Sequence, residues 1–152
     1  MLYRFLRDAL SRHFRETKSL VGQLTDSMVL AEPVASGGRP LGEIILHMIR
    51  SIEYYIRGLA TDVWEALPYQ LSAYGTATSI QQLYDEVVAR SMRYLEEIDP
   101  STLDDMINRF NRPATKAEIL LEILEHSIQH RGQVLVYYRL IGIKSAVIPY
   151  II

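Results

Sequence analysis

Apolar residues recur at helical spacing in four stretches of the chain, and polar stretches separate them. The first stretch runs from about residue 2 to 24, and the second from about 40 to 60. Pro40 suits the first turn of a helix, where its missing N–H would have no partner. The third stretch begins near residue 79, and the fourth spans about 115 to 140. The pattern therefore predicts four long amphipathic helices.

Two of these helices begin with the pattern of a capping box, in which Ser or Thr is followed three residues later by Glu or Gln. Ser79-x-x-Gln82 has this pattern at the start of the third helix, and Thr115-x-x-Glu118 has it at the start of the fourth. The third helix should end by Asp99, because the proline after it disfavours a helical conformation.

The segments between the helices are long. Residues 61–78 read as a loop whose apolar side chains should pack on the helices (Trp64, Leu67 and Tyr69). Residues 101–114 are irregular, and we expect a short extended pair around residues 106–110. The tail at 147–152 is apolar, so we expect it to pack on the bundle or on a partner subunit.

Four helices of ~20 residues with few strand signals predict an all-α four-helix bundle. The whole chain, residues 1–152, fits one domain of this kind, because its length allows a sizeable core. The long connections leave the order of helix directions open at this stage.

The composition removes several classes of function. The chain has no cysteine, which excludes disulfides, Cys-ligated zinc, iron–sulfur clusters and thiol catalysis by the protein itself. The formal net charge is -2 and no block of like charge stands out, so neither nucleic acid nor membrane is expected as a partner. No stretch approaches the ~20 apolar residues of a membrane span. Charged residues in the first turns argue against a signal peptide, and we expect a cytoplasmic protein.

Two histidines stand out on the fourth predicted helix. His126 and His130 are four residues apart, so their rings point to the same face. Ile123, Val134 and Tyr137 continue that stripe, which predicts that the two imidazoles project from an apolar, core-directed surface. A buried polar ring needs a partner, and a metal ion would provide one. Hydrogen-bonded core or surface histidines are nevertheless the commoner explanation of this spacing alone.

Known helical metal motifs do not match this pair. A zincin protease has Glu directly after the first histidine, where this chain has Ser127. Carboxylate-bridged di-iron bundles have Glu three residues before the histidine, where this chain has Ile123 and Ile44. Both the protease and the di-iron site are therefore disfavoured. His47 lies midway along the second helix among apolar residues, and with the other two it could form a three-nitrogen site that leaves positions open for water or substrate.

Two segments of the chain resemble the paired motifs of DinB/YfiT-like proteins. One runs from His126 to Val134 (HSIQHRGQV) and the other from Arg39 to His47 (RPLGEIILH). The resemblance covers nearly the whole chain in length and helix order. It implies a four-helix bundle with up-down-down-up order and one divalent metal ion, zinc or nickel. The three histidines that bind the metal in this family map onto His47, His126 and His130.

The resemblance also implies a homodimer and a choice of functions. Some relatives are metal-dependent transferases or isomerases that use a low-molecular-weight thiol. The first hypothesis is accordingly a metal-dependent thiol transferase or hydrolase. The second is a non-catalytic metal-binding or stress-related interaction protein. The third is a structural bundle whose histidines only hydrogen-bond one another.

Neighbouring polar residues allow two interpretations. Glu122 and Glu43 each lie one turn before a candidate ligand and could accept a hydrogen bond from its ring, although solvated helix glutamates are commoner. Arg131, in the signature with Gln133, could bind a substrate carboxylate, but a structural salt bridge is the favoured role.

Three further features are assigned structural roles. His13 lies on the apolar stripe of the first helix, and we expect it to be a packed, hydrogen-bonded core residue. Gly132 is a poor helix former, and we expect it to permit close helix packing. The ten tyrosines are expected in the core and at interfaces.

Overall fold

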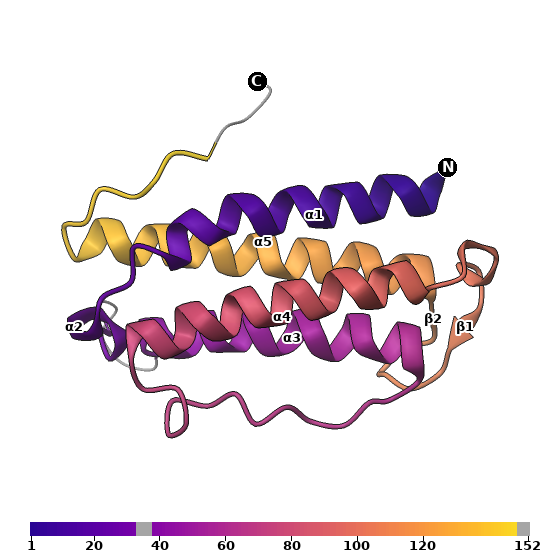
Figure 1. Ribbon diagram of the computed structural model, residues 1–152, viewed down its shortest axis with the longest axis horizontal. Coiled ribbons are helices and arrows are strands. Elements are labelled where there is room, and N and C mark those ends of the chain that lie inside the picture. The colour runs from indigo at the N-terminus through magenta and orange to yellow at the C-terminus, as the bar shows by residue number, and fades with distance from the viewer. Residues whose placement is uncertain (33–37, 149–152) are drawn as a thin grey trace.

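The computed structural model describes residues 1–32 and 38–148 of the chain. The predicted all-α bundle is confirmed: four long helices lie side by side (Figure 1), namely α1 (Leu2–Val21), α3 (Leu41–Thr61), α4 (Ala77–Glu97) and α5 (Lys116–Leu140). The shorter elements are α2 (Asp26–Val29), the 3-10 helix η1 (Pro100–Thr102), β1 (Met106–Ile107) and β2 (Ala114–Thr115). None of the helices in the described ranges combines the length and apolar character that a membrane crossing requires.

The helices follow the up-down-down-up order that the family resemblance implied. In Figure 1, α1 and α5 run in one direction while α3 and α4 run in the other. Residues 62–76 make this order possible, because they travel back along the bundle and let α4 start at the same end as α3. As a result, α3 packs against both α4 and α5.

The core lies between the apolar faces of these helices, and α3 supplies its centre. Side chains on α3 are fully buried at near-helical spacing (Leu41, Ile45, Met48, Ile49, Ile52 and Ile56). Phe14 of α1, Tyr84 of α4 and Tyr138 of α5 close the core around them. Complete burial of one such side chain contributes about 1.5–3 kcal/mol, so this face fixes the orientation of α3 and of its outward-pointing residues.

One of the two predicted capping boxes is confirmed, and the other is formed by different residues. At α5, Thr115 Oγ1 accepts from the backbone N–H of Glu118, whose carboxylate accepts from that of Thr115, as predicted. At α4, the box is formed by Thr76 and Ser79, so the prediction of Ser79-x-x-Gln82 was wrong. Ser79 takes the Glu or Gln position of the pattern because its own hydroxyl reaches back to the N–H of Thr76.

The loop at 62–76 is anchored to the bundle, as its apolar side chains indicated. The hydroxyl of Tyr69 donates to Glu53 Oε2 at 2.6 Å, and Arg90 of α4 donates to both carboxylate oxygens of Glu53. Trp64 lies so close to Gly58 that a Cβ there would approach its ring to 2.3 Å. Gly58 is therefore required where the loop passes over α3.

The two remaining segments lie at opposite ends of α5. Met106–Ile107 pairs antiparallel with Ala114–Thr115, so the expected extended segment is shorter than residues 106–110 and its partner strand lies later in the chain. After α5 the chain turns back (Figure 1), and the Gln23 side chain, two residues after α1, donates to the carbonyl of Lys144 and accepts from the N–H of Ala146. Of the tail predicted to pack, residues 149–152 lie outside the described residues.

Candidate metal centre

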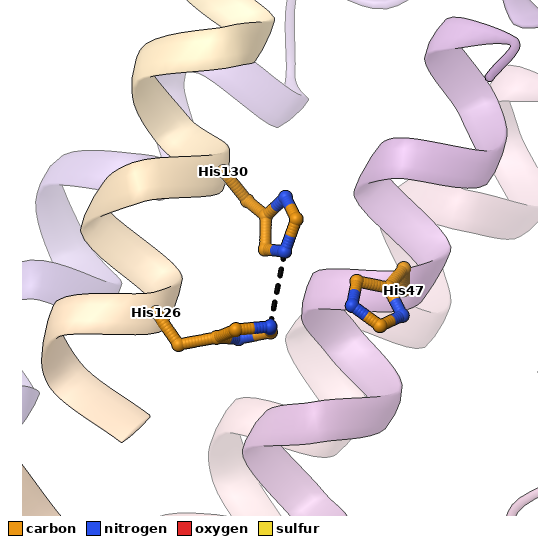
Figure 2. Close-up of side chains that lie close together, drawn as sticks. All are labelled: His47, His126 and His130. Atoms are coloured by element: carbon orange, nitrogen blue, oxygen red, sulfur yellow. Dashed lines mark hydrogen bonds between the residues drawn. The ribbon is translucent and has the colours of Figure 1, made fainter. Parts of the chain in front are cut away.

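Three imidazoles from two distant helices meet at one point of the bundle. His47 projects from α3 toward His126 and His130 of α5, as Figure 2 shows. The centroid of the His47 ring lies 5.2 Å from that of His126 and 4.8 Å from that of His130. One nitrogen from each ring can be chosen so that all three lie within 4.8 Å of one another. The sequence prediction that these residues converge is therefore met.

The pair on α5 is already at the spacing of two ligands of one ion. The Nε2 atoms of His126 and His130 are 3.0 Å apart. Two nitrogens that each lie ~2.1 Å from a common ion are separated by about 3.0–3.4 Å for angles between right and tetrahedral. His47 faces this pair from the opposite helix, and one of its ring nitrogens lies within 4.8 Å of a nitrogen of each of the other two rings.

Gln133 fixes the tautomer of His130. The Nδ1 of His130 lies 2.7 Å from Gln133 Oε1. A carbonyl oxygen only accepts, so Nδ1 carries the proton and Nε2 presents its lone pair to the centre of the cluster. The Nδ1 of His126 is buried and has no partner in residues 1–32 and 38–148.

The histidines lie beside the buried line of α5 rather than on it, which corrects the sequence prediction. The fully buried line passes through Ile123, Ser127, Arg131 and Val134. The residues of this line recur at helical spacing, but two of them are polar. An apolar pattern alone therefore placed the core face one position away, on the line of the two histidines. His126 and His130 are half-buried, as is His47. A bound ion would therefore have protein on one side and open space on the other.

Burial and nearby positive charge favour the neutral form of two of the imidazoles, those of His47 and His126. Desolvation lowers the pKa of His47 to about 4, and His130, His126, Arg39 and Arg50 add to this effect. Burial and the neighbouring His130 also lower the pKa of His126. Neutral imidazole is the form that binds a metal ion, so these two rings are ready to act as ligands at neutral pH.

Clefts lined by the described residues open onto the cluster. One of about 560 Å³ borders His126, one of about 620 Å³ borders His47, and one of about 960 Å³ lies between His47 and His130. Each histidine thus faces space in which a small molecule could reach an ion held by the three rings.

Neither neighbouring carboxylate accepts a hydrogen bond from a histidine ring. Glu43 Oε1 pairs with Arg50 at 2.6 Å, and Glu122 pairs with Arg112. The hypothesis that these glutamates orient the ligands is therefore not met. In the described residues the one orienting acceptor is Gln133, to which the sequence analysis gave no role. Because Gln133 follows His130 by three residues on the same helix, the sequence spacing could have indicated this contact.

The fourth histidine lies apart from the cluster. His13 is 3% exposed, and its Nδ1 accepts from the Arg131 guanidinium at 3.1 Å. Arg131 also donates to Glu16 Oε2 at 3.2 Å. Both residues therefore have the structural roles predicted for them, a packed core histidine and a salt bridge between α1 and α5.

Gly132 does not serve close helix packing, so that prediction was wrong. A Cβ built at this position meets no atom within 4 Å. Gly132 instead borders the cleft between His47 and His130, two residues after His130.

Comparison with known proteins agrees with this fold. Residues 9–134 match the family described as the DinB superfamily. The uncharacterized protein YjoA of Bacillus subtilis (strain 168) is 26% identical over 103 residues, which are 66% of this chain and just under two thirds (66%) of that relative.

Solved structures show the same architecture. The DinB-like protein YjoA of Bacillus subtilis superposes with a TM-score of 0.76 at 20% identity, over 95% of both chains. A DinB-like protein of Bacillus cereus ATCC 10987 gives 0.78 at 22% identity, over 97% of this chain and 95% of the other. A member of the DinB family from Exiguobacterium sibiricum 255-15 gives 0.69 at 20% identity, over 96% and 95%. At these identities the likeness establishes the fold alone.

Proposed function

We propose that this chain, which belongs to the DinB superfamily, holds one divalent transition-metal ion with His47, His126 and His130 and acts there on a small molecule. The observation that carries the proposal is the convergence of three imidazoles from two helices, with ligand nitrogens within 4.8 Å of one another and two of them 3.0 Å apart. Such a donor set suits zinc or nickel, because both bind imidazole nitrogen well.

The chain supplies orientation and access. Gln133 holds the lone pair of His130 toward the cluster, and burial keeps His47 neutral. Three protein ligands leave coordination positions for a further molecule, and the surrounding clefts lead to them. When bound, the ion would lower the pKa of a coordinated thiol or water enough to give a nucleophile near neutral pH.

The paired carboxylates limit the chemistry that protein side chains can perform. Glu43 and Glu122 are engaged by arginines, so neither is free to act as a general base beside the cluster. A metal-dependent thiol transferase or hydrolase needs no such base for its nucleophile, and we propose this reaction class. The second candidate is a metal-binding protein without catalysis, for which the same pairing of both carboxylates is the supporting observation.

Metal analysis of protein purified without a histidine tag tests the site. We expect one zinc or nickel ion per chain after loading and dialysis. Replacing His47, His126 or His130 with Ala should weaken binding at least 100-fold, since each removes one of three ligands.

The matched control is His13→Gln, which removes the histidine outside the cluster. It should keep full metal stoichiometry, with circular dichroism confirming the helical fold of every variant. Equal metal loss in His13→Gln and His47→Ala would overturn the proposed site.

An activity screen separates the two candidate functions. Metal-loaded protein is incubated with low-molecular-weight thiols and small electrophiles, and also with ester and amide substrates. Turnover that disappears in His47→Ala supports the enzyme, whereas a fully loaded protein without turnover supports the non-catalytic alternative.

A further inference from the structure

The cleft between His47 and His130 is the largest of the three that open onto the cluster, at about 960 Å³. It lies between the first half of α3 and the C-terminal half of α5, from Gln129 to Tyr137. Because two of the three proposed ligands line it, a molecule in this cleft would reach the ion directly.

Among the described residues that line this cleft, Arg39 is the one with a permanently charged side chain. It lies just before α3, eight residues before His47 in the chain, and lines the same cleft as that ring. The hydroxyl of Tyr137, itself 7% exposed, donates to the carbonyl of Arg39 at 3.0 Å and holds this backbone against α5. Within residues 1–32 and 38–148, no carboxylate forms a salt bridge with Arg39.

The other arginines around the cluster are already engaged. Arg50 pairs with Glu43, and Arg112 pairs with Glu122. Arg109 lies over the Trp64 ring, 5.7 Å from its centroid. A bound anion would therefore meet the least competition at Arg39.

Gly132 keeps the same cleft open. A glycine inside a helix lowers helix stability by about 1 kcal/mol relative to alanine, and here no neighbouring atom requires it. A side chain at this position would enter open space at the cleft that Gly132 and His130 both line. Packing within the described residues therefore does not require this glycine, and the open position leaves room for a ligand.

The charge of the site favours an anion. Three neutral imidazoles leave the charge of a divalent ion uncompensated, and Arg39 adds a further positive charge to the cleft. A guanidinium also matches a carboxylate with two parallel hydrogen bonds.

We propose that this cleft binds small organic acids in preference to neutral molecules. An ionisable group of the acid, such as a thiol, would bind the metal ion, and its carboxylate would bind Arg39. Arg39 is then the residue that determines specificity for acidic over neutral molecules. This inference rests on the proposed metal site.

Binding of thiols to cobalt-substituted protein tests the selection. The probes are ω-mercapto carboxylic acids of three to six carbons, each compared with the mercapto alcohol of the same length. Absorption from sulfur-to-cobalt charge transfer reports the dissociation constant of each. We expect at least one acid to bind about tenfold more tightly than its alcohol, because only the acid reaches Arg39 with a charged group.

Two variants assign the preference. In Arg39→Gln the acid-to-alcohol ratio should fall to near one, whereas in Arg109→Gln, an arginine at another of the clefts, it should persist. Gly132→Phe should weaken the acid and the alcohol alike at least tenfold, because its ring fills the space that both occupy.

The outcomes separate this inference from the metal site. Cobalt stoichiometry is measured first, and its absence would overturn the site and the inference together. A ratio near one at every length, or a preference that survives Arg39→Gln, would overturn the inference while leaving the site intact.

Discussion

Single residues around the cluster decide how ready each imidazole is to bind. The Oε1 of Gln133 accepts a hydrogen bond from the Nδ1 of His130 at 2.7 Å. The Nδ1 of His126, in contrast, is buried with no partner in the described residues. The two ligands on one helix therefore differ in how firmly their rings are held. This difference was not visible in the sequence, because it depends on side-chain rotamers and not on helical spacing.

Removal of the acceptor at position 133 should weaken the site. We expect Gln133→Leu to lower metal affinity roughly tenfold, because His130 loses the hydrogen bond that fixes its tautomer and ring orientation. Competition with a chromophoric chelator measures the change. Gln129→Leu alters the other glutamine that lines the same cleft and should leave the affinity within twofold. Equal losses in both variants would mean that Gln133 does not act through His130.

Burial of a neutral His13 should make stability depend on pH. Desolvation and the Arg131 charge lower the pKa of His13 from 6.5 to about 3 in the folded protein. As the pH falls below 6.5, His13 becomes protonated in the unfolded chain but stays neutral in the folded chain. The free energy of unfolding therefore decreases. Between pH 6.5 and pH 4.5 this group should remove about 2–3 kcal/mol.

Urea unfolding of metal-free protein at several pH values measures that loss. The His13→Gln variant lacks the titrating group, so its free energy of unfolding should fall less over the same interval. Parallel pH profiles for the two proteins would show that His13 is protonated as readily in the folded state as in the unfolded state.

At the scale of elements, the helices were predictable where local signals decide. Apolar periodicity located all four long helices, and the Thr115 and Glu118 pair marked the start of α5. The box at α4 was misplaced because Ser79 fits the first position of the pattern, whereas in the structure its hydroxyl takes the place of the Glu or Gln that the pattern expects three residues after Thr76. The buried line of α5 was also misplaced, since Ser127 and Arg131 are buried through tertiary contacts that the sequence pattern does not encode.

A glycine in α5 offers a direct test of its role in the fold. Gly132→Ala should raise the free energy of unfolding by about 0.5–1 kcal/mol, because alanine favours the helix and its Cβ meets no atom within 4 Å. Gly42→Ala is the contrasting variant, since a Cβ there would lie 2.8 Å from Val29 Cγ1, and it should destabilise the protein. Chemical unfolding compares them. A destabilised Gly132→Ala would mean that this position is packed after all.

At the scale of the whole molecule, the direction of the helices could not be derived from periodicity. The up-down-down-up order came from family resemblance, and the loop at 62–76 explains it physically. Glu53, which is 3% exposed, binds both Tyr69 of that loop and Arg90 of α4. The convergence of the histidines follows from the same order, because it places α3 directly against α5.

The homodimer remains a prediction of family resemblance and of exposed apolar residues. Val147 in the tail is 84% exposed, and Phe5 on α1 is 68% exposed. Sedimentation at micromolar concentration should give particles of about 35 kDa, twice the chain mass of 17.5 kDa. Phe5→Glu should shift them toward the monomer if α1 contributes to the contact. Particles of monomer mass alone, at all concentrations tested, would contradict the dimer.

The separation of the three histidines along the chain has a thermodynamic consequence. His47 and His126 are 126 − 47 = 79 positions apart, so an ion that joins them acts as a reversible cross-link across more than half of the chain. The unfolded chain would release this ion, and resistance to unfolding would then rise by about 1.4 kcal/mol for each tenfold increase in free metal above the dissociation constant. The melting temperature of this bundle would serve as a gauge of how much metal its surroundings supply.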